Sequence, residues 1–215
     1  MARRLTDLQR QILLAMLEVE EEHSRDPLRS QIFGNTIAPE TVAWKILTRR
    51  LQQQGVETSN AELWLDQMIS IGFETAESAS KMLRSLVENV KRAMRKLAAR
   101  NILLESLWKA KGRPVVRYTL SPIGRSLAKT LRFKEKCDSE KGRGELIEAA
   151  LNRLREEKRK EGRPAYATTD EILEELKQTS IELYRVNRDT VEKYWNRKKL
   201  GAELKKRGYK LVKKR

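Results

Sequence analysis

The segment from Leu83 to Arg100 constrains the fold of this chain most, because its apolar residues recur with the period of a helix. With Val90 as the reference and about 100° per residue, the apolar side chains fall within about 60° of one direction. They are Leu83, Leu86, Val87, Val90, Ala93, Met94 and Leu97. The rest of the circle is almost purely cationic, with Arg84, Lys91, Arg92, Arg95, Lys96 and Arg100. This pattern predicts a helix with one face in a core and a basic face toward solvent.

A hairpin pattern follows this helix directly. Strand-forming residues at 102–108 and 115–120 flank the turn-forming stretch 109–114, which is the order expected of two antiparallel strands. The turn and the strand after it would carry Lys109, Lys111, Arg113 and Arg117. The sequence therefore predicts a basic helix followed by a hairpin with a basic tip.

The sequence before this helix predicts further helices. Capping signals at Thr6 and Ser59, and a proline at position 39 that suits a first helical turn, place helices at 5–22 and within 39–72. The tryptophans are expected in the cores, and they are Trp44, Trp64, Trp108 and Trp195.

Residues 134–144 show no apolar periodicity and contain glycines. This composition predicts a linker, in which Cys137 would be an exposed thiol. The linker would join a first unit over residues 1–133 to a second unit over residues 145–215.

The second unit begins with helical patterns. Leu146 lies in the first of them, and a capping box at Thr168 opens the next one. The alternation at 181–186 predicts a short strand, and the basic end of the chain, 209–215, predicts another strand.

Residues 188–207 resemble one helix, but the apolar residues of its two halves would not lie on the same face. In an unbroken helix, Leu200 and Leu204 would lie about 140–180° away from Trp195. We therefore expect a turn near 196–198 between two short helices. The cations of this region are Arg188, Arg197, Lys198, Lys199, Lys205, Lys206, Lys210 and Lys213.

The charge of the chain is strongly unbalanced. Its 215 residues include 46 Lys and Arg against 30 Asp and Glu, a net charge of +16. The excess lies in 81–117 and 185–215, whereas residues 1–80 are more acidic than basic. A merely solvated surface would interleave acids with bases, and these two basic segments do not. We therefore expect a polyanionic partner, and nucleic acid is the first candidate.

Several function classes are disfavoured by composition. One histidine, His23, and one cysteine, Cys137, cannot form a four-ligand zinc site, and no glycine-rich phosphate loop is present. We therefore expect no enzyme activity, no cofactor and no metal. No apolar run approaches a membrane span and the first residues do not form a signal peptide, so we expect no membrane contact and a cytoplasmic, nucleoid-associated protein.

The stretches 92–97, 101–103, 112–114 and 118–124 resemble the winged helix-turn-helix family of microbial transcription regulators. In that family a recognition helix enters the major groove and the wing reaches an adjacent groove or the backbone. The resemblance assigns these roles to Arg84, Lys91, Arg92, Arg95 and Lys96 in the helix and to Lys111 and Arg113 in the wing. The stretch 200–208 resembles the end of winged-helix domains appended to some archaeal and phage replication proteins. The resemblances imply a mainly α fold with small β-hairpin wings, organised as tandem winged helix-turn-helix domains.

These patterns together predict a protein that binds double-stranded DNA. The expected contacts also include Arg100, Lys109 and Arg117, together with the cations of the second unit. A sequence-specific transcription regulator is the first interpretation, and a replication or plasmid-maintenance initiator or a non-specific architectural protein are the alternatives. The N-terminal helices exceed what one winged helix needs, so they could form a homodimer interface. A nuclease or recombinase is the least favoured class, since no carboxylate cluster for Mg²⁺ stands out.

Overall fold

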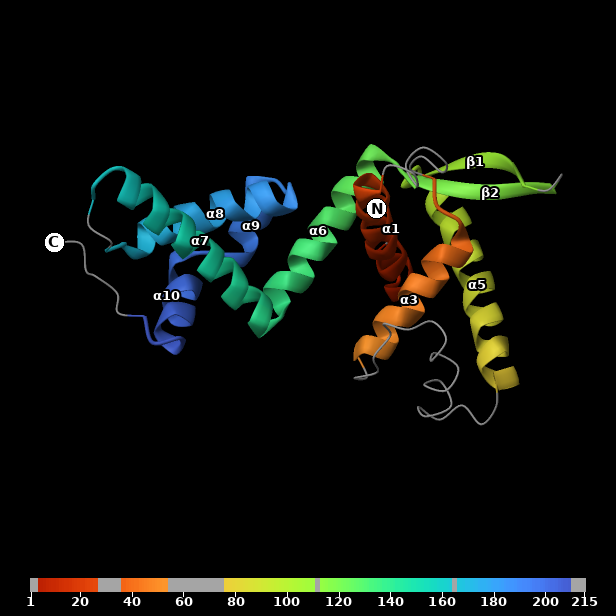
Figure 1. Cartoon of the computed structure of the whole chain (residues 1–215), viewed down its shortest axis with the longest axis horizontal. Coiled ribbons are helices and arrows are strands. Elements are labelled where there is room, and N and C mark those ends of the chain that lie inside the picture. Colours follow the sequence, from red (N-terminus) through yellow and green to blue (C-terminus); the bar gives the residue numbers. More distant parts are fainter. Residues whose placement is uncertain (1–3, 27–35, 54–75, 111–112, 164–165, 210–215) are drawn as a thin grey trace. The chain divides into compact units, whose positions relative to one another are not determined.

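A computed structural model describes residues 4–26, 36–53, 76–110, 113–163 and 166–209 of the chain. The fold is mainly helical with one two-stranded antiparallel sheet among the described residues (Figure 1). The chain divides into two units, Met1–Ala128 and Lys129–Arg215. No helix in the described part of the chain is long and apolar enough to cross a bilayer.

The first unit is built on three helices, α1 (Asp7–Arg25), α3 (Pro39–Gln53) and α5 (Ala76–Ala98), which pack against one another (Figure 1). The expected capping box opens α1, because Thr6 Oγ1 accepts from the Gln9 N–H and the Gln9 side chain accepts from the Thr6 N–H. Every residue from Ile12 to Leu17 is buried. This part of α1 therefore offers no exposed face to a second copy of the chain.

The predicted hairpin follows α5. The turn after α5 includes a left-handed residue, Asn101 (φ 55°), a conformation that asparagine adopts more readily than most residues. Strands β1 (Leu103–Ala110) and β2 (Arg113–Leu120) then pair with Leu103 opposite Leu120. Ile37 adds a single antiparallel bridge to Tyr118, with hydrogen bonds of 2.7 and 2.9 Å between the two backbones. The strands are longer than expected, and the two residues between them, 111 and 112, lie outside the described residues.

A buried carboxylate ties α1 to the end of the hairpin and to α6 (Pro122–Asp138). Glu20 accepts two hydrogen bonds from Arg125, Nε to Oε2 at 3.0 Å and Nη2 to Oε1 at 3.2 Å. Its Oε1 also accepts from the Leu120 N–H at 3.3 Å. The N-cap of α6 is Ser121, as expected, because its Oγ accepts from the Gly124 N–H at 3.0 Å. The position of the hairpin on the helices is thus fixed by polar contacts as well as by the core.

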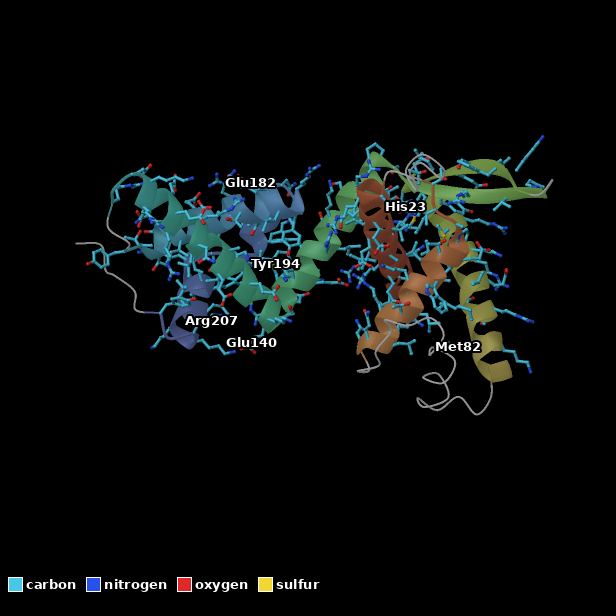
Figure 2. The ribbon with its side chains drawn as sticks, viewed as in Figure 1. His23, Met82, Glu140, Glu182, Tyr194 and Arg207 are labelled. Carbon is cyan, nitrogen blue, oxygen red and sulfur yellow. The ribbon has the colours of Figure 1, made fainter. Side chains whose placement is uncertain are left out.

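The second unit packs the end of α6 against α7 (Glu140–Lys160), α8 (Thr169–Tyr184), α9 (Arg188–Tyr194) and α10 (Arg197–Lys206). Its core includes Phe133, Leu176 and the fully buried Trp195. Tyr194 of α9 lies beside α6, with its ring edge-on to Phe133 at a centroid distance of 5.6 Å (Figure 2). The capping box at Thr168 opens α8, and the turn expected between α9 and α10 is present at Trp195 and Asn196.

The linker expected over 134–144 is wrong, because these residues are the end of α6 and the start of α7, separated only at Ser139. Its glycines are sites of close packing. A Cβ on Gly142 would lie 2.2 Å from the Lys136 carbonyl oxygen, and one on Gly144 would lie 2.5 Å from the Arg207 guanidinium. Cys137 is accordingly buried, at 5% exposure, instead of exposed. The contact boundary between the units falls within α6 at Ala128.

Two further expectations about the elements need correction. The strand expected at 181–186 is mostly helix, because α8 continues to Tyr184 and stops where Arg185 adopts a left-handed conformation. Trp44 and Trp108 are 38% and 37% exposed, so they are not core residues, whereas Trp195 is. The helix capped by Ser59 with Trp64, and the strand at 209–215 beyond Tyr209, lie outside the described residues.

Candidate nucleic-acid interface

The two faces of α5 differ as the helical pattern predicted. Leu86, Val90, Met94 and Leu97 are buried between α5 and the rest of the first unit. The opposite face is exposed and carries Arg84, Arg92, Arg95, Lys96 and Arg100. The apolar residues thus fix the helix in place, and the fixed helix holds the cations in one surface.

Three cations of α5 have neither an ion pair nor a side-chain hydrogen bond among the described residues. They are Arg84, Arg92 and Lys96, and we call them the α5 basic face. Arg92 and Lys96 are four residues apart, so they are neighbours one turn apart on the helix. Unpaired exposed cations at this spacing can meet successive negative groups of a rigid polyanion without first breaking an ion pair.

Lys91 and Arg95, also predicted to contact DNA, have partners within the protein. The Lys91 ammonium lies 3.1 Å from Glu40 and 3.2 Å from Glu88, and the hydrogen bond that it donates to Glu40 is the main cause that raises the Lys91 pKa. The Arg95 guanidinium donates to the buried Tyr118 hydroxyl. Arg95 therefore connects α5 to β2 as well as facing solvent. Arg100, at the end of the helix, is exposed and also makes a contact within the protein.

Tyr118 is a residue of this surface that the sequence did not single out. Burial is the main cause that raises its pKa, with Glu105 adding to the increase and Arg95 opposing it. The phenol lies between these two charged groups and joins the helix to the hairpin. Glu105 lies directly opposite Tyr118 in the hairpin register, so the hairpin pattern of the sequence could have indicated that these two residues are neighbours. The contact between Tyr118 and Arg95 depends on the packing of the hairpin on α5, which no local pattern indicates.

The hairpin presents Lys109 to solvent, whereas Arg117 has a structural role. Arg117 Nη2 donates to the Thr36 carbonyl oxygen at 2.8 Å, and its guanidinium lies 5.5 Å from the centroid of the Trp108 ring. Burial lowers its pKa. Arg117 therefore holds the hairpin to the strand segment before α3. Lys111 and the side chain of Arg113 lie outside the described residues.

In the second unit, α10 carries the cations that are best placed for an external partner. Lys198 and Lys205 are exposed and have no carboxylate partner in the described part of the chain. Both lie on the side of α10 away from the buried Leu200 and Leu204. Asn196 caps this helix by accepting from the Lys199 N–H at 2.9 Å.

The other predicted contacts of the second unit are engaged in surface interactions. Arg188 pairs with Glu174 and Glu192, Arg197 pairs with Asp170, and Lys206 pairs with Glu140. Lys199 donates to the Lys193 carbonyl oxygen at 3.3 Å. Exposed pairs of this kind are worth about 0–1 kcal/mol, so a phosphate could replace the carboxylates at little cost. Lys210 and Lys213 lie outside the described residues.

Comparison of the chain with protein-family models, with curated protein sequences and with solved structures finds no match. The described residues bring no group of three or more His, Cys, Asp or Glu side chains together that could hold a metal ion.

Proposed function

We propose that this protein binds double-stranded DNA, with α5 as the recognition helix of a winged helix-turn-helix unit and the β1–β2 hairpin as its wing. The order of elements supports this proposal, since α1, the Ile37 bridge, α3, α5 and the hairpin follow one another along the chain. The observation that carries the proposal is the α5 basic face, which is exposed, has no ion-pair partner among the described residues, and lies opposite an apolar face that packs into the core.

The dimensions of α5 suit this role. A helix with its side chains is about 10–12 Å across, and the major groove of B-DNA is about 12 Å wide. Arginine can donate two hydrogen bonds to a guanine edge, so Arg92 is the side chain to which we assign base recognition. Lys96 and Arg84 would mainly neutralise phosphates, and Lys109 would do so from the hairpin.

We propose that the second unit binds the same DNA through α10, with α9 and α10 as a helix-turn-helix. This rests on Lys198 and Lys205, which are exposed on the outer side of α10 and have no ion-pair partner in the parts of the chain that the structure describes. The arrangement would make the chain a tandem DNA-binding protein. A second copy that joined through the N-terminal helices would not reach the buried stretch of α1 from Ile12 to Leu17, whereas Trp44 of α3 is 38% exposed.

Sequence-specific transcription regulation is the role we favour, because an arginine-bearing helix in the major groove reads bases. Initiation of replication or plasmid maintenance, and non-specific architectural binding, use the same contacts and differ in where the protein sits on a genome.

Selection of bound duplexes from a random pool, followed by recovery of bound genomic fragments, tests the proposal. An enriched motif near promoters supports a regulator, a motif confined to one or two origins supports an initiator, and a smooth spread supports an architectural protein. Failure to retain duplex DNA at low salt, or equal retention of single strands, would refute duplex recognition through α5.

A further inference from the structure

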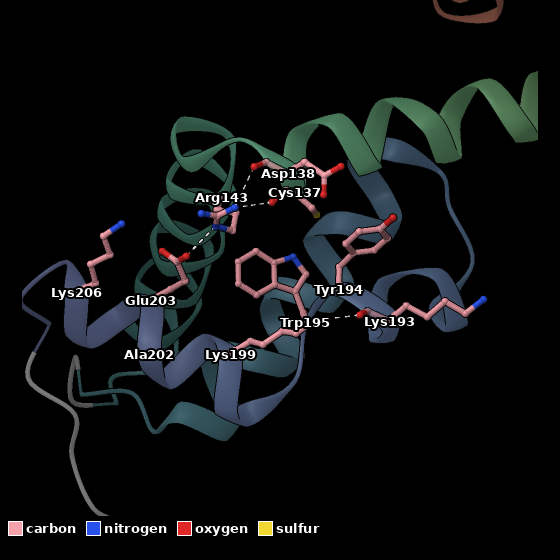
Figure 3. A pocket seen from close by; sticks show the side chains of 10 residues that line it. All are labelled: Cys137, Asp138, Arg143, Lys193, Tyr194, Trp195, Lys199, Ala202, Glu203 and Lys206. Carbon is pink, nitrogen blue, oxygen red and sulfur yellow. Dashed lines mark hydrogen bonds and ion pairs between the residues drawn. The ribbon is translucent and has the colours of Figure 1, made fainter. Parts of the chain in front are cut away.

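The second unit contains a cavity of about 500 Å³ where the end of α6, the start of α7, the end of α9 and one side of α10 meet (Figure 3). This volume is in the range that small organic ligands occupy. The proposed DNA contacts Lys198 and Lys205 do not line it. The cavity is therefore a feature of the second unit that DNA binding does not explain.

Aromatic side chains form one wall of the cavity. Trp195 is 2% exposed, and its position is fixed where it ends α9, with its backbone N–H donating to the Val191 carbonyl oxygen at 2.9 Å. Its indole Nε1 has no hydrogen-bond partner that meets normal geometry in the described part of the chain. The ring nitrogen faces the Cys137 thiol, a weak acceptor, in Figure 3. Tyr194 lies next to it and is only partly buried, so Tyr194 supplies the ring surface that a flat ligand can reach.

The other wall is positively charged. The Glu203 carboxylate lies 2.7 Å from Arg143 Nε and 3.6 Å from Arg207 Nε, so two guanidinium groups neutralise one acid. Lys193 has no ion pair among the described residues, and the Lys199 ammonium donates to the Lys193 carbonyl oxygen at 3.3 Å. Asp138 is the opposing acid at the edge of the cavity. The cations outnumber the acids, which favours a negatively charged ligand.

We propose that this cavity binds a small aromatic anion, with its ring against Tyr194, next to the buried Trp195, and its charged group toward Lys193 and Lys199. The anion could be an aromatic carboxylate or the phosphate of a mononucleotide, since both join a flat ring to a negative group. The proposal does not depend on DNA binding, and it is tested by a measurement that contains no DNA.

The test is a titration of the ¹⁵N-labelled full-length chain, followed by the side-chain N–H resonance of Trp195 in the NMR spectrum. This resonance is identified by its loss in Trp195→Phe. Addition of 2-naphthoate, or of AMP in a second titration, should shift it saturably, with half-saturation at about 1 mM or below. A tighter response to one of the two identifies the source of the anion, and either result supports the site.

Two controls separate the site from general binding. Ala202 lies on the cavity wall, and Ala202→Leu should fill space and weaken binding about tenfold or more. Gly201→Leu is the matched variant, because a Cβ at Gly201 meets nothing within 4 Å, and it should leave binding within about twofold. Circular dichroism checks that both variants are folded, and Lys193→Glu supplies an independent loss of affinity at the charged edge.

Three results would overturn the proposal. The first is no shift of the Trp195 resonance by either ligand up to about 10 mM. The second is an equal response to the neutral 2-naphthamide, which would show that the charge is not needed, or to inorganic phosphate, which would show that the ring is not needed. The third is undiminished binding in Ala202→Leu.

Discussion

Replacement of the two unpaired lysines of α10 tests whether the second unit contacts DNA. In Lys198→Gln/Lys205→Gln, two proposed phosphate contacts are removed, and neither lysine has a carboxylate partner in the described structure whose loss could complicate the result. Each phosphate contact contributes about −0.9 to the slope of log K against log salt. The phosphate contacts that we propose among described residues are Arg84, Lys96, Lys109, Lys198 and Lys205.

These contacts predict a slope of about −4.5 for the wild-type chain, and about −2.7 for the double variant. The same relation gives an affinity loss of up to about 60-fold at about 0.1 M salt. Contacts from the residues outside the described structure would make both slopes steeper and leave their difference unchanged. The difference of about 1.8 between the two slopes is therefore the quantity to measure.

Fluorescence anisotropy with a labelled duplex, from about 50 to about 200 mM salt, supplies both slopes. The matched control is Lys141→Gln/Lys160→Gln, which removes the same charge from exposed positions of α7 that we do not assign to DNA. Its slope should equal that of the wild type. If the α10 variant keeps the wild-type slope, the second unit does not engage DNA and the tandem proposal is wrong. Equal losses in both double variants would show a response to net charge alone.

Other predictions concern the structure that positions these surfaces. Glu20→Ala should lower the free energy of unfolding of the first unit by about 2–3 kcal/mol, because it leaves Arg125 and the Leu120 N–H without their acceptor. Glu22→Ala removes the half-exposed pair with Lys45 and should lower the same free energy by only about 0–1 kcal/mol. Urea unfolding measures both changes. The Thr168 N–H, followed by Lys158, lowers the pKa of Glu171 to about 2, so the stability that this carboxylate contributes is complete above about pH 4.5 and is lost as the pH falls toward 2. The difference in urea midpoint between wild type and Glu171→Gln should accordingly be largest at neutral pH and vanish near pH 2, and a constant difference would contradict this origin. Burial raises the pKa of the Cys137 thiol to about 12, so it should react with a thiol reagent far more slowly than in the chain unfolded by urea; equal rates would mean that the end of α6 is open.

Local patterns in the sequence were sufficient for the elements that carry the proposed interface. The apolar period of α5 fixed which of its residues are buried, because one face of the helix has to meet a core. The capping boxes at Thr6 and Thr168 marked the starts of their helices, since their side chains bond to backbone only three residues away. The phase change after Trp195 located the turn between α9 and α10 for the same reason.

Contacts between distant parts of the chain were not accessible in this way. Gly142 and Gly144 suggested a flexible linker, but they are small because the Lys136 carbonyl and the Arg207 side chain approach them closely. Arg95 and Arg117 counted as free cations in the sequence, and their partners, Tyr118 and Thr36, are brought to them only by the packing of the hairpin on the helices. A sequence pattern thus identifies a basic surface more reliably than it identifies which of its cations are available.

The central claim, that α5 reads DNA bases, is tested most directly by Arg92→Ala on two duplexes, a selected site and a shuffled one. Arg92 is exposed on α5 and has no carboxylate partner in the described structure, so its removal should leave the fold intact. The matched control is Arg155→Ala, an exposed arginine of α7 outside the proposed contacts. We predict that Arg92→Ala costs about 1–3 kcal/mol on the selected site and clearly less on the shuffled one, whereas Arg155→Ala changes neither. Equal losses on the two duplexes would contradict base recognition by α5 and leave only a non-specific cationic helix.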